Sequence, residues 1–235
     1  MPQPFLYNLI DKAVFDYKLI EKGDKILVGA SGGKDSTALI EYFANRQKRK
    51  NADFEFLALN IQTDFGGGLP SDIQTLFKEW NVPVKSIFVD VTGRLTDGYK
   101  MSCYWCSNLR RKELINFAVK NGFNKIALGH NMDDVLETFL LNLLYTGSIS
   151  TFAPKSYMDR TKVTLIRPLI LLSEKDTRRF VKKYNKPVMP KVCPMDEHTK
   201  RESIKEQIFL WQKDIPMVRA NLFGAISRNL EGWKK

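Results

Sequence analysis

The strongest constraint on the fold is an alternation of short apolar runs with longer stretches of helical periodicity. Each run is rich in β-branched residues and has the length of a strand that is buried on both faces. Five strands are predicted, at residues 25–31, 54–61, 84–90, 125–130 and 164–169. Helical patterns lie at residues 35–49, 71–80, 108–121 and 133–145, and more helix follows residue 173. This order predicts an α/β fold, in which helices cover both faces of a parallel sheet.

A glycine-rich turn, Ser31–Ser36 (SGGKDS), joins the first predicted strand to the first predicted helix. Its glycines let the backbone approach an anion closely, and the first amides of the helix point toward that anion. Lys34 adds a positive charge, whereas Asp35 suits a metal ligand or a helix cap. The turn is not a Walker A loop, because its glycine spacing differs and an aspartate follows the lysine. We therefore predict a phosphate-binding turn of another kind; a generic strand-to-helix turn is the alternative.

A second polar sequence, GHNMDD at residues 129–134, follows the fourth predicted strand. The carboxyl ends of parallel strands meet at one edge of a sheet, where ligands bind. His130, Asp133 and Asp134 are therefore expected to face the phosphate-binding turn and to bind nucleotide or Mg²⁺. The alternative is a helix N-terminus, which Asn131 and the aspartates would cap, and both can hold together. The helix at residues 133–145 is apolar almost all round, which indicates either a central core helix or the interface of a homodimer.

Three cysteines are present, at Cys103, Cys106 and Cys193. No apolar run is long enough to span a membrane and no secretion signal is evident, so we expect a cytoplasmic protein. In that reducing compartment the cysteines are more consistent with metal ligands or free thiols than with a disulfide framework. Spacing alone leaves three interpretations open: an iron–sulfur cluster, a redox dithiol, and a zinc site completed by His198.

The positive charge is concentrated in the last 86 residues. Residues 150–235 hold 19 Lys and Arg against 9 Asp and Glu, which is +10 of the total net charge of +11. Such a region favours a polyanionic partner, and a solvated basic surface is the alternative. Two regions are predicted, an α/β domain at residues 1–170 and a basic helical region at residues 171–235. The candidate RNA contacts are Arg110, Arg111, Arg167, Lys175, Arg178, Arg179, Lys182 and Lys183.

The SGGKDS turn after an apolar strand resembles the signature of the PP-loop ATP pyrophosphatases, which have the adenine nucleotide alpha hydrolase-like fold and cleave ATP to AMP and pyrophosphate. Together with GHNMDD it looks like the tRNA 2-thiocytidine synthetase family, over about residues 25–212. Three further motifs carry that likeness: Cys103-Tyr-Trp-Cys106, Ser107-Asn-Leu-Arg-Arg111 and Ile166-Arg-Pro-Leu169. The chain departs from the family at its second C-x2-C, where Cys193 stands alone.

The resemblance implies adenylation of the C2 oxygen of a tRNA pyrimidine by ATP with Mg²⁺, followed by sulfur transfer. It implies a [4Fe–4S] cluster on Cys103, Cys106 and Cys193, with sulfide or a cysteine desulfurase as sulfur donor. It gives catalytic roles to Lys34, Asp35 and Asp134. The residues expected to bind ATP are Ala30, Ser31, Gly32, Gly33, Lys34, Asp35, Ser36, Asn60, Gly129, His130 and Asp133.

Three alternatives compete with a 2-thiocytidine synthetase. A 2-thiouridine synthetase or a small-molecule synthetase with a structural zinc site would use the same PP loop. The small-molecule enzyme would leave the basic region and the cysteines without a role. A non-catalytic nucleotide-binding or RNA-binding protein is a third class, against which the intact Lys34, Asp35 and GHNMDD argue.

Overall fold

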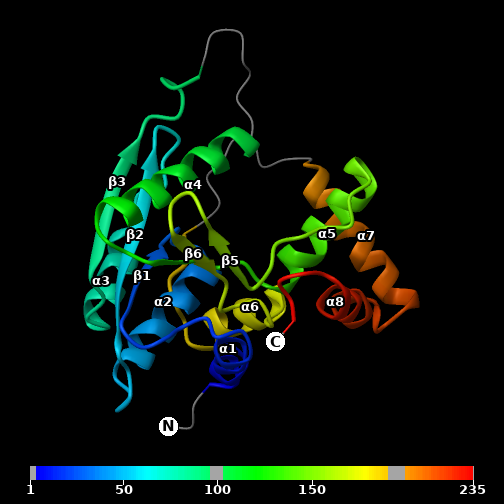
Figure 1. Cartoon of the computed structure of the whole chain (residues 1–235), viewed down its shortest axis with the longest axis horizontal. Coiled ribbons are helices and arrows are strands. Elements are labelled where there is room, and N and C mark those ends of the chain that lie inside the picture. Colours follow the sequence, from blue (N-terminus) through cyan, green and yellow to red (C-terminus); the bar gives the residue numbers. More distant parts are fainter. Residues whose placement is uncertain (1–3, 96–102, 190–198, 235) are drawn as a thin grey trace.

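The computed structural model describes residues 4–95, 103–189 and 199–234 (Figure 1). A six-stranded sheet in the order β3-β2-β1-β4-β6-β5 forms its centre. The first five strands of that order run parallel, and only β5 pairs antiparallel, with β6. The strands are β1 Asp24–Gly29, β2 Phe54–Thr63, β3 Val84–Val89, β4 Lys125–Ala127, β5 Lys155–Met158 and β6 Val163–Ile166.

Helices cover both faces of the sheet, as the sequence predicts. Alternate residues of β1 show this, since Ile26 and Val28 pack into the larger core and Leu27 packs into the opposite one. That opposite core is closed by α4, which crosses the sheet on one side (Figure 1). The helices are α1 Phe5–Asp16, α2 Lys34–Gln47, α3 Ser71–Glu79, α4 Cys103–Lys120, α5 Met132–Thr146, α6 Glu174–Lys183, α7 Lys200–Asp214 and α8 Val218–Asn229.

The strand order fixes where a ligand can bind. The chain moves from β1 outward to β2 and β3, and then returns to place β4 on the other side of β1. The crevice between the carboxyl ends of β1 and β4 is therefore the point where the strand order reverses, which is the usual ligand site of such sheets. The SGGKDS turn follows β1 and GHNMDD follows β4, so both motifs lie at this point.

The three C-terminal helices have two different locations. Helix α6 packs against α2 and α1, whereas α7 and α8 pack against α5 and against each other (Figure 1). Val135, Leu136 and Leu140 of α5 are buried, but Leu144 and Tyr145 near its end are exposed. Among the described residues, no helix combines the length and apolar character that crossing a bilayer requires.

Two elements were not expected from the sequence. One is α1, whose Leu6, Ile10 and Val14 are buried in the larger core. The other is the edge strand β5, which is only four residues long and has a mixed polar sequence. Because β5 pairs antiparallel with β6, the sheet is mostly parallel and not wholly so.

Candidate active site

The turn after β1 is held in shape by its own hydroxyls. The Ser31 hydroxyl donates to Ser36 Oγ over 3.0 Å, and the Ser36 hydroxyl donates to the Gly33 carbonyl over 2.9 Å. Gly33 is the N-cap of α2, and within the described chain no side chain caps that helix. The first amides of α2 therefore lack an intrahelical partner and can donate to an anion.

Glycine is required at two positions around this turn. Gly32 has a φ of +77°, and its carbonyl accepts a hydrogen bond from the Met189 amide over 2.8 Å. A Cβ at Gly129 would lie 3.3 Å from the Ser36 amide nitrogen, which is closer than most real side chains pack. The loop after β4 thus touches the first turn of α2, and a side chain there would push the two apart.

A pocket of about 520 Å³ opens between these loops and α4. Its polar wall combines the turn, His130 and the basic start of α4, and its apolar wall comes from strand ends and α4. A flat, partly apolar ligand with a phosphate tail suits such a lining. The lining residues that bear on chemistry are Gly29, Ala30, Ser31, Asp35, Ser36, Gly129, His130, Cys106, Ser107, Arg110 and Arg111, with Leu59, Ile61, Leu114 and Leu128.

Lys34 lies between two carboxylates. Its Nζ is 2.8 Å from Asp35 Oδ2 and 3.2 Å from Glu174 Oε1. Burial opposes the charged form, but these two carboxylates outweigh it and raise the pKa of Lys34. The lysine is therefore protonated and half-buried, as binding of a phosphate requires.

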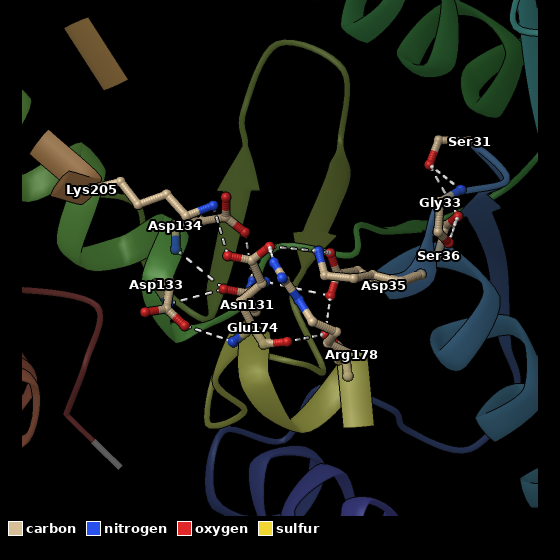
Figure 2. Close-up of polar contacts among 12 residues, drawn as sticks. Ser31, Gly33, Asp35, Ser36, Asn131, Asp133, Asp134, Glu174, Arg178 and Lys205 are labelled. Carbon is tan, nitrogen blue, oxygen red and sulfur yellow. Dashed lines mark hydrogen bonds and ion pairs between the residues drawn. The ribbon is translucent and has the colours of Figure 1, made fainter. Parts of the chain in front are cut away.

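Asp35 is fixed by side chains from two other elements. Its Oδ1 accepts a hydrogen bond of 2.6 Å from the Thr177 hydroxyl and one of 3.4 Å from Asn131 Nδ2. Thr177 lies on α6 and is fully buried. Because Asp35 also contacts Lys34, this carboxylate joins the turn, the loop after β4 and α6 (Figure 2).

The start of α5 is a reciprocal capping box. Asn131 Oδ1 accepts from the amides of Asp133 and Asp134, and Asp134 Oδ2 accepts from the Asn131 amide over 2.9 Å. Asp133 is buried, and its Oδ2 accepts from the Glu174 amide over 2.6 Å (Figure 2). Its Oδ1 pairs with Arg219. The capping interpretation of this sequence is thus correct, and the nucleotide and Mg²⁺ roles of the two aspartates stay predictions.

His130 is a partly exposed histidine whose Nδ1 is buried. Its Nδ1 has no hydrogen-bond partner in the described part of the chain, and its ring lies 4.9 Å from that of Phe152. Burial, helped by the charges of Arg167 and Arg111, lowers the pKa of His130 to about 3. Near neutral pH this imidazole can therefore donate or accept a hydrogen bond but carries no charge.

Two other expected site residues support the surrounding backbone. Asn60 is buried, and its Nδ2 donates to the carbonyls of Ala30 and Gly67 over 2.8 and 3.0 Å. Arg167 is also buried, and it donates to the Ala153 carbonyl and lies over the Phe152 ring at 4.7 Å. Burial, and then the charge of Arg111, lower the pKa of Arg167 to about 10. The predicted contact of Arg167 with RNA stays a prediction.

The structure describes part of the expected cysteine site. Cys106 is a buried free thiol that lines the pocket, and Cys103 begins α4 one turn earlier. Cys193 and His198 lie outside the described residues. Within residues 4–95, 103–189 and 199–234, no three His, Cys, Asp or Glu side chains are grouped as metal ligands.

The basic side chains of α6 differ in their surroundings. Lys175, Arg178, Arg179, Lys182 and Lys183 are all exposed, and Arg178 among them lies 2.9 Å from Glu174 Oε1. Arg110 and Arg111 line the pocket instead. Lys186 follows the end of α6 and pairs with Glu41 at 3.2 Å.

Sequence reasoning missed the residues that hold the C-terminal helices to the site. They come from α6, α7 and α8 and form ion pairs or hydrogen bonds with the predicted residues. The Ser173-x-x-Asp176 capping box predicts that a helix begins at residue 174. No sequence signal indicates what that helix would contact. The missed residues are Glu174, Thr177, Arg201, Lys205 and Arg219.

Comparisons with known proteins agree with this geometry. The family model of the PP-loop domain matches residues 7–210. The tRNA-cytidine(32) 2-sulfurtransferase of Dichelobacter nodosus is 35% identical over 96% of this chain and 86% of its own length. The protein of the same name from Marinobacter nauticus is 36% identical over 95% and 76%. Among solved structures, the U34-tRNA thiolase NcsA from Methanococcus maripaludis with its [4Fe–4S] cluster has a TM-score of 0.79. It is 18% identical and covers 97% of this chain and 81% of that one.

Proposed function

The chain belongs to the PP-loop domain family and, within it, to the tRNA-cytidine 2-sulfurtransferases, and from this premise we propose that it replaces the C2 oxygen of a tRNA cytidine by sulfur. One observation carries the proposal. A single pocket is lined by the PP loop, by His130 and by Cys106 with Arg110 and Arg111. Under this proposal, groups that suit ATP, a sulfur-carrying site and an RNA phosphate would share one cavity.

In the first step the C2 oxygen attacks the α-phosphorus of ATP, and pyrophosphate leaves. The free amides of α2 and the Lys34 ammonium would bind the departing phosphates, because they supply donors and charge where negative charge accumulates. Catalysis of this kind consists mostly of positioning. Asp35 is well placed for it, since Thr177 and Asn131 fix its carboxylate.

Mg²⁺ would be held by Asp35 and Asp134. Burial is the main cause that raises the pKa of Asp134, and the negative charge of Asp35 adds to it. A divalent cation that shares oxygens of both carboxylates would relieve that repulsion. His130 would act beside them as a neutral hydrogen-bonding group, because its Nδ1 is buried and lacks a partner in the described structure.

In the second step a sulfur nucleophile attacks C2 and the adenylated oxygen leaves as AMP. The cysteines fit a [4Fe–4S] cluster in donor type, since thiolates are its usual ligands. Cys106 lines the pocket, and Met189, whose amide binds Gly32, is four residues before Cys193. When bound, the cluster would supply an iron that carries sulfur from sulfide or a cysteine desulfurase.

The RNA would lie against α6 and the start of α4. Lys175, Arg179, Lys182 and Lys183 expose their charge on α6, as phosphate contacts require. Residues 171–235 would thereby form a basic region that adds tRNA contacts and Cys193 to the α/β domain at residues 1–170. We further propose a cytoplasmic homodimer, in which the exposed Leu144 and Tyr145 of α5 lie at the interface.

One experiment tests the proposed function. Anaerobically purified protein is incubated with tRNA, ATP, Mg²⁺ and sulfide, and both nucleotides and modified bases are measured. We expect AMP, pyrophosphate and 2-thiocytidine, and Lys34→Ala should abolish all three while the protein stays folded. ADP as the main nucleotide product would exclude the PP-loop reaction. Formation of AMP without a thiolated cytidine would show that the substrate is another base or another molecule.

A further inference from the structure

Three positively charged side chains contact the Glu174 carboxylate, and one of them, Lys34, belongs to the PP loop. Its Oε1 lies 3.2 Å from Lys34 Nζ and 2.9 Å from an Arg178 nitrogen, and its Oε2 lies 2.9 Å from Lys205 Nζ. Figure 2 shows Lys205 and Arg178 reaching Glu174 from different elements. Burial opposes the charge, but hydrogen bonds from Lys205 and the charge of Lys34 lower the pKa of Glu174 to about 2. The carboxylate is therefore ionised at every working pH.

Lys34 has a limited number of donors to share. An ammonium has three N–H groups, and here two of them can be directed at Asp35, at 2.8 Å, and at Glu174, at 3.2 Å. Phosphate oxygens bound at the turn would need the same ammonium. Glu174 and a phosphate are thus competing anions for one cation, and the side chains of both Lys34 and Glu174 are mostly shielded from solvent, at 23% and 21% exposed.

Lys205 can set the strength of this competition. It lies on α7 and pairs with Glu174 Oε2, the oxygen opposite to the one that Lys34 contacts. A cation on one oxygen draws charge from the other and weakens its hold on Lys34. The backbone of Glu174 is anchored separately, because its amide donates to Asp133, which Arg219 also contacts. The side chain can therefore exchange partners while the start of α6 stays in place.

We propose that Glu174 is a positioning residue that limits the phosphate affinity of the PP loop by competing for Lys34, and that Lys205 tunes this competition from α7. The inference rests on the proposed function, because ATP must be the ligand of the turn. In catalysis this competition would speed the release of pyrophosphate, because Lys34 can pair with Glu174 again as the product dissociates. The charged partners that face Glu174 come from the PP loop, from its own helix and from α7.

The test measures dissociation constants for pyrophosphate and for a non-cleavable ATP analogue with Mg²⁺, by calorimetry on the full chain. Glu174→Gln should bind both about three- to tenfold more tightly, since an amide competes poorly for an ammonium. Lys205→Met should bind both several-fold more weakly. Glu206→Gln is the matched control, because Glu206 is exposed on the same helix as Lys205 and its replacement makes the same change in charge as Glu174→Gln.

A double-mutant cycle separates this competition from general electrostatics. If Lys205 acts through Glu174, Lys205→Met should have no effect in the Glu174→Gln background. An effect of equal size in both backgrounds would overturn the role of Lys205. Weaker binding in Glu174→Gln together with a lower melting temperature, or an affinity equal to that of Glu206→Gln, would overturn the role of Glu174. Wild-type protein that binds neither ligand would instead refute the proposed ATP site itself.

Discussion

Gly129 lies against the amide of Ser36, so closely that a Cβ at Gly129 would stand 3.3 Å from that nitrogen. The two residues follow β4 and β1, which are neighbours in the sheet. Their contact is therefore a direct result of the strand order. It brings the backbone of GHNMDD onto the helix turn whose amides are expected to bind phosphate.

Gly129→Ala should weaken ATP use more than it weakens the fold. The added methyl must displace either the first turn of α2 or the loop after β4, and both displacements misplace donors for phosphate. We expect at least a roughly tenfold loss in kcat/KM for AMP formation, with a small change in melting temperature. Gly29→Ala is the matched control, because its Cβ would meet nothing nearer than 3.7 Å. Equal losses in both variants would show that the contact with Ser36 has no special role.

The dependence of protein stability on pH should reflect the lowered pKa of His130. Its pKa is lowered from 6.5 to about 3 in the folded protein, so between these values the unfolded chain binds a proton that the folded chain does not. The free energy of unfolding should therefore fall as the pH falls from about 6.5 toward 3. His130→Gln should flatten this slope, and denaturant unfolding at a series of pH values would measure it. An unchanged slope in the variant would mean that other groups cause the acid sensitivity.

Much of this site follows from sequence, because a parallel sheet aligns the ends of its strands. The sequence predicts that SGGKDS and GHNMDD meet, and Gly129 does touch Ser36. The contact between Thr177 and Asp35 could not be predicted in this way. It joins residues 142 positions apart and depends on how α6 packs against α2. Local patterns fix where a helix begins, but they do not fix which face of another helix it will contact.

Arg167 illustrates a second limit. Arg167 lies within the strand predicted at residues 164–169, and its predicted contact with RNA requires an exposed guanidinium. In the structure β5 pairs beside it, and the Arg167 guanidinium binds the Ala153 carbonyl next to the Phe152 ring. The edge strand was missed because four residues of mixed polarity carry too weak a periodic signal. Without that strand, the burial of Arg167 could not be foreseen.

The exposed charges of α6 should contribute to tRNA binding. Reversing Lys175, Arg179 and Lys182 to Glu spares Arg178, which contacts Glu174. We expect weaker binding and a shallower dependence of affinity on salt, by roughly 0.7–0.9 in slope for each phosphate that the variant no longer binds. The control reverses Lys22, Lys48 and Lys50, which are exposed near the opposite ends of the strands. Equal effects in the two variants would indicate a general charge effect. The specific RNA contacts would then be sought at Arg110 and Arg111.

The cysteines make the most discriminating prediction, because the cluster and the zinc site require different fourth ligands. A [4Fe–4S] cluster on Cys103, Cys106 and Cys193 leaves one iron without a cysteine, and it makes no use of His198. A zinc site on the same cysteines needs His198 to complete four ligands. Under the cluster assignment, His198→Ala should keep its iron, its brown colour and its thiolation activity. Cys106→Ser should lose all three, since Cys106 lines the pocket beside the PP loop.

The measurement is iron and zinc analysis with a visible spectrum, on protein purified without oxygen. Cys193→Ser should destroy the site in either case, and therefore tests only whether this distant residue is a ligand. If Cys193→Ser retained its metal, Cys193 would not be a ligand of the site that Cys103 and Cys106 form. Zinc at one per chain that is lost in His198→Ala would overturn the cluster, because binding of a structural metal is coupled to its full ligand set. The second step of the proposed reaction would then need another route for sulfur, although the ATP site would stand.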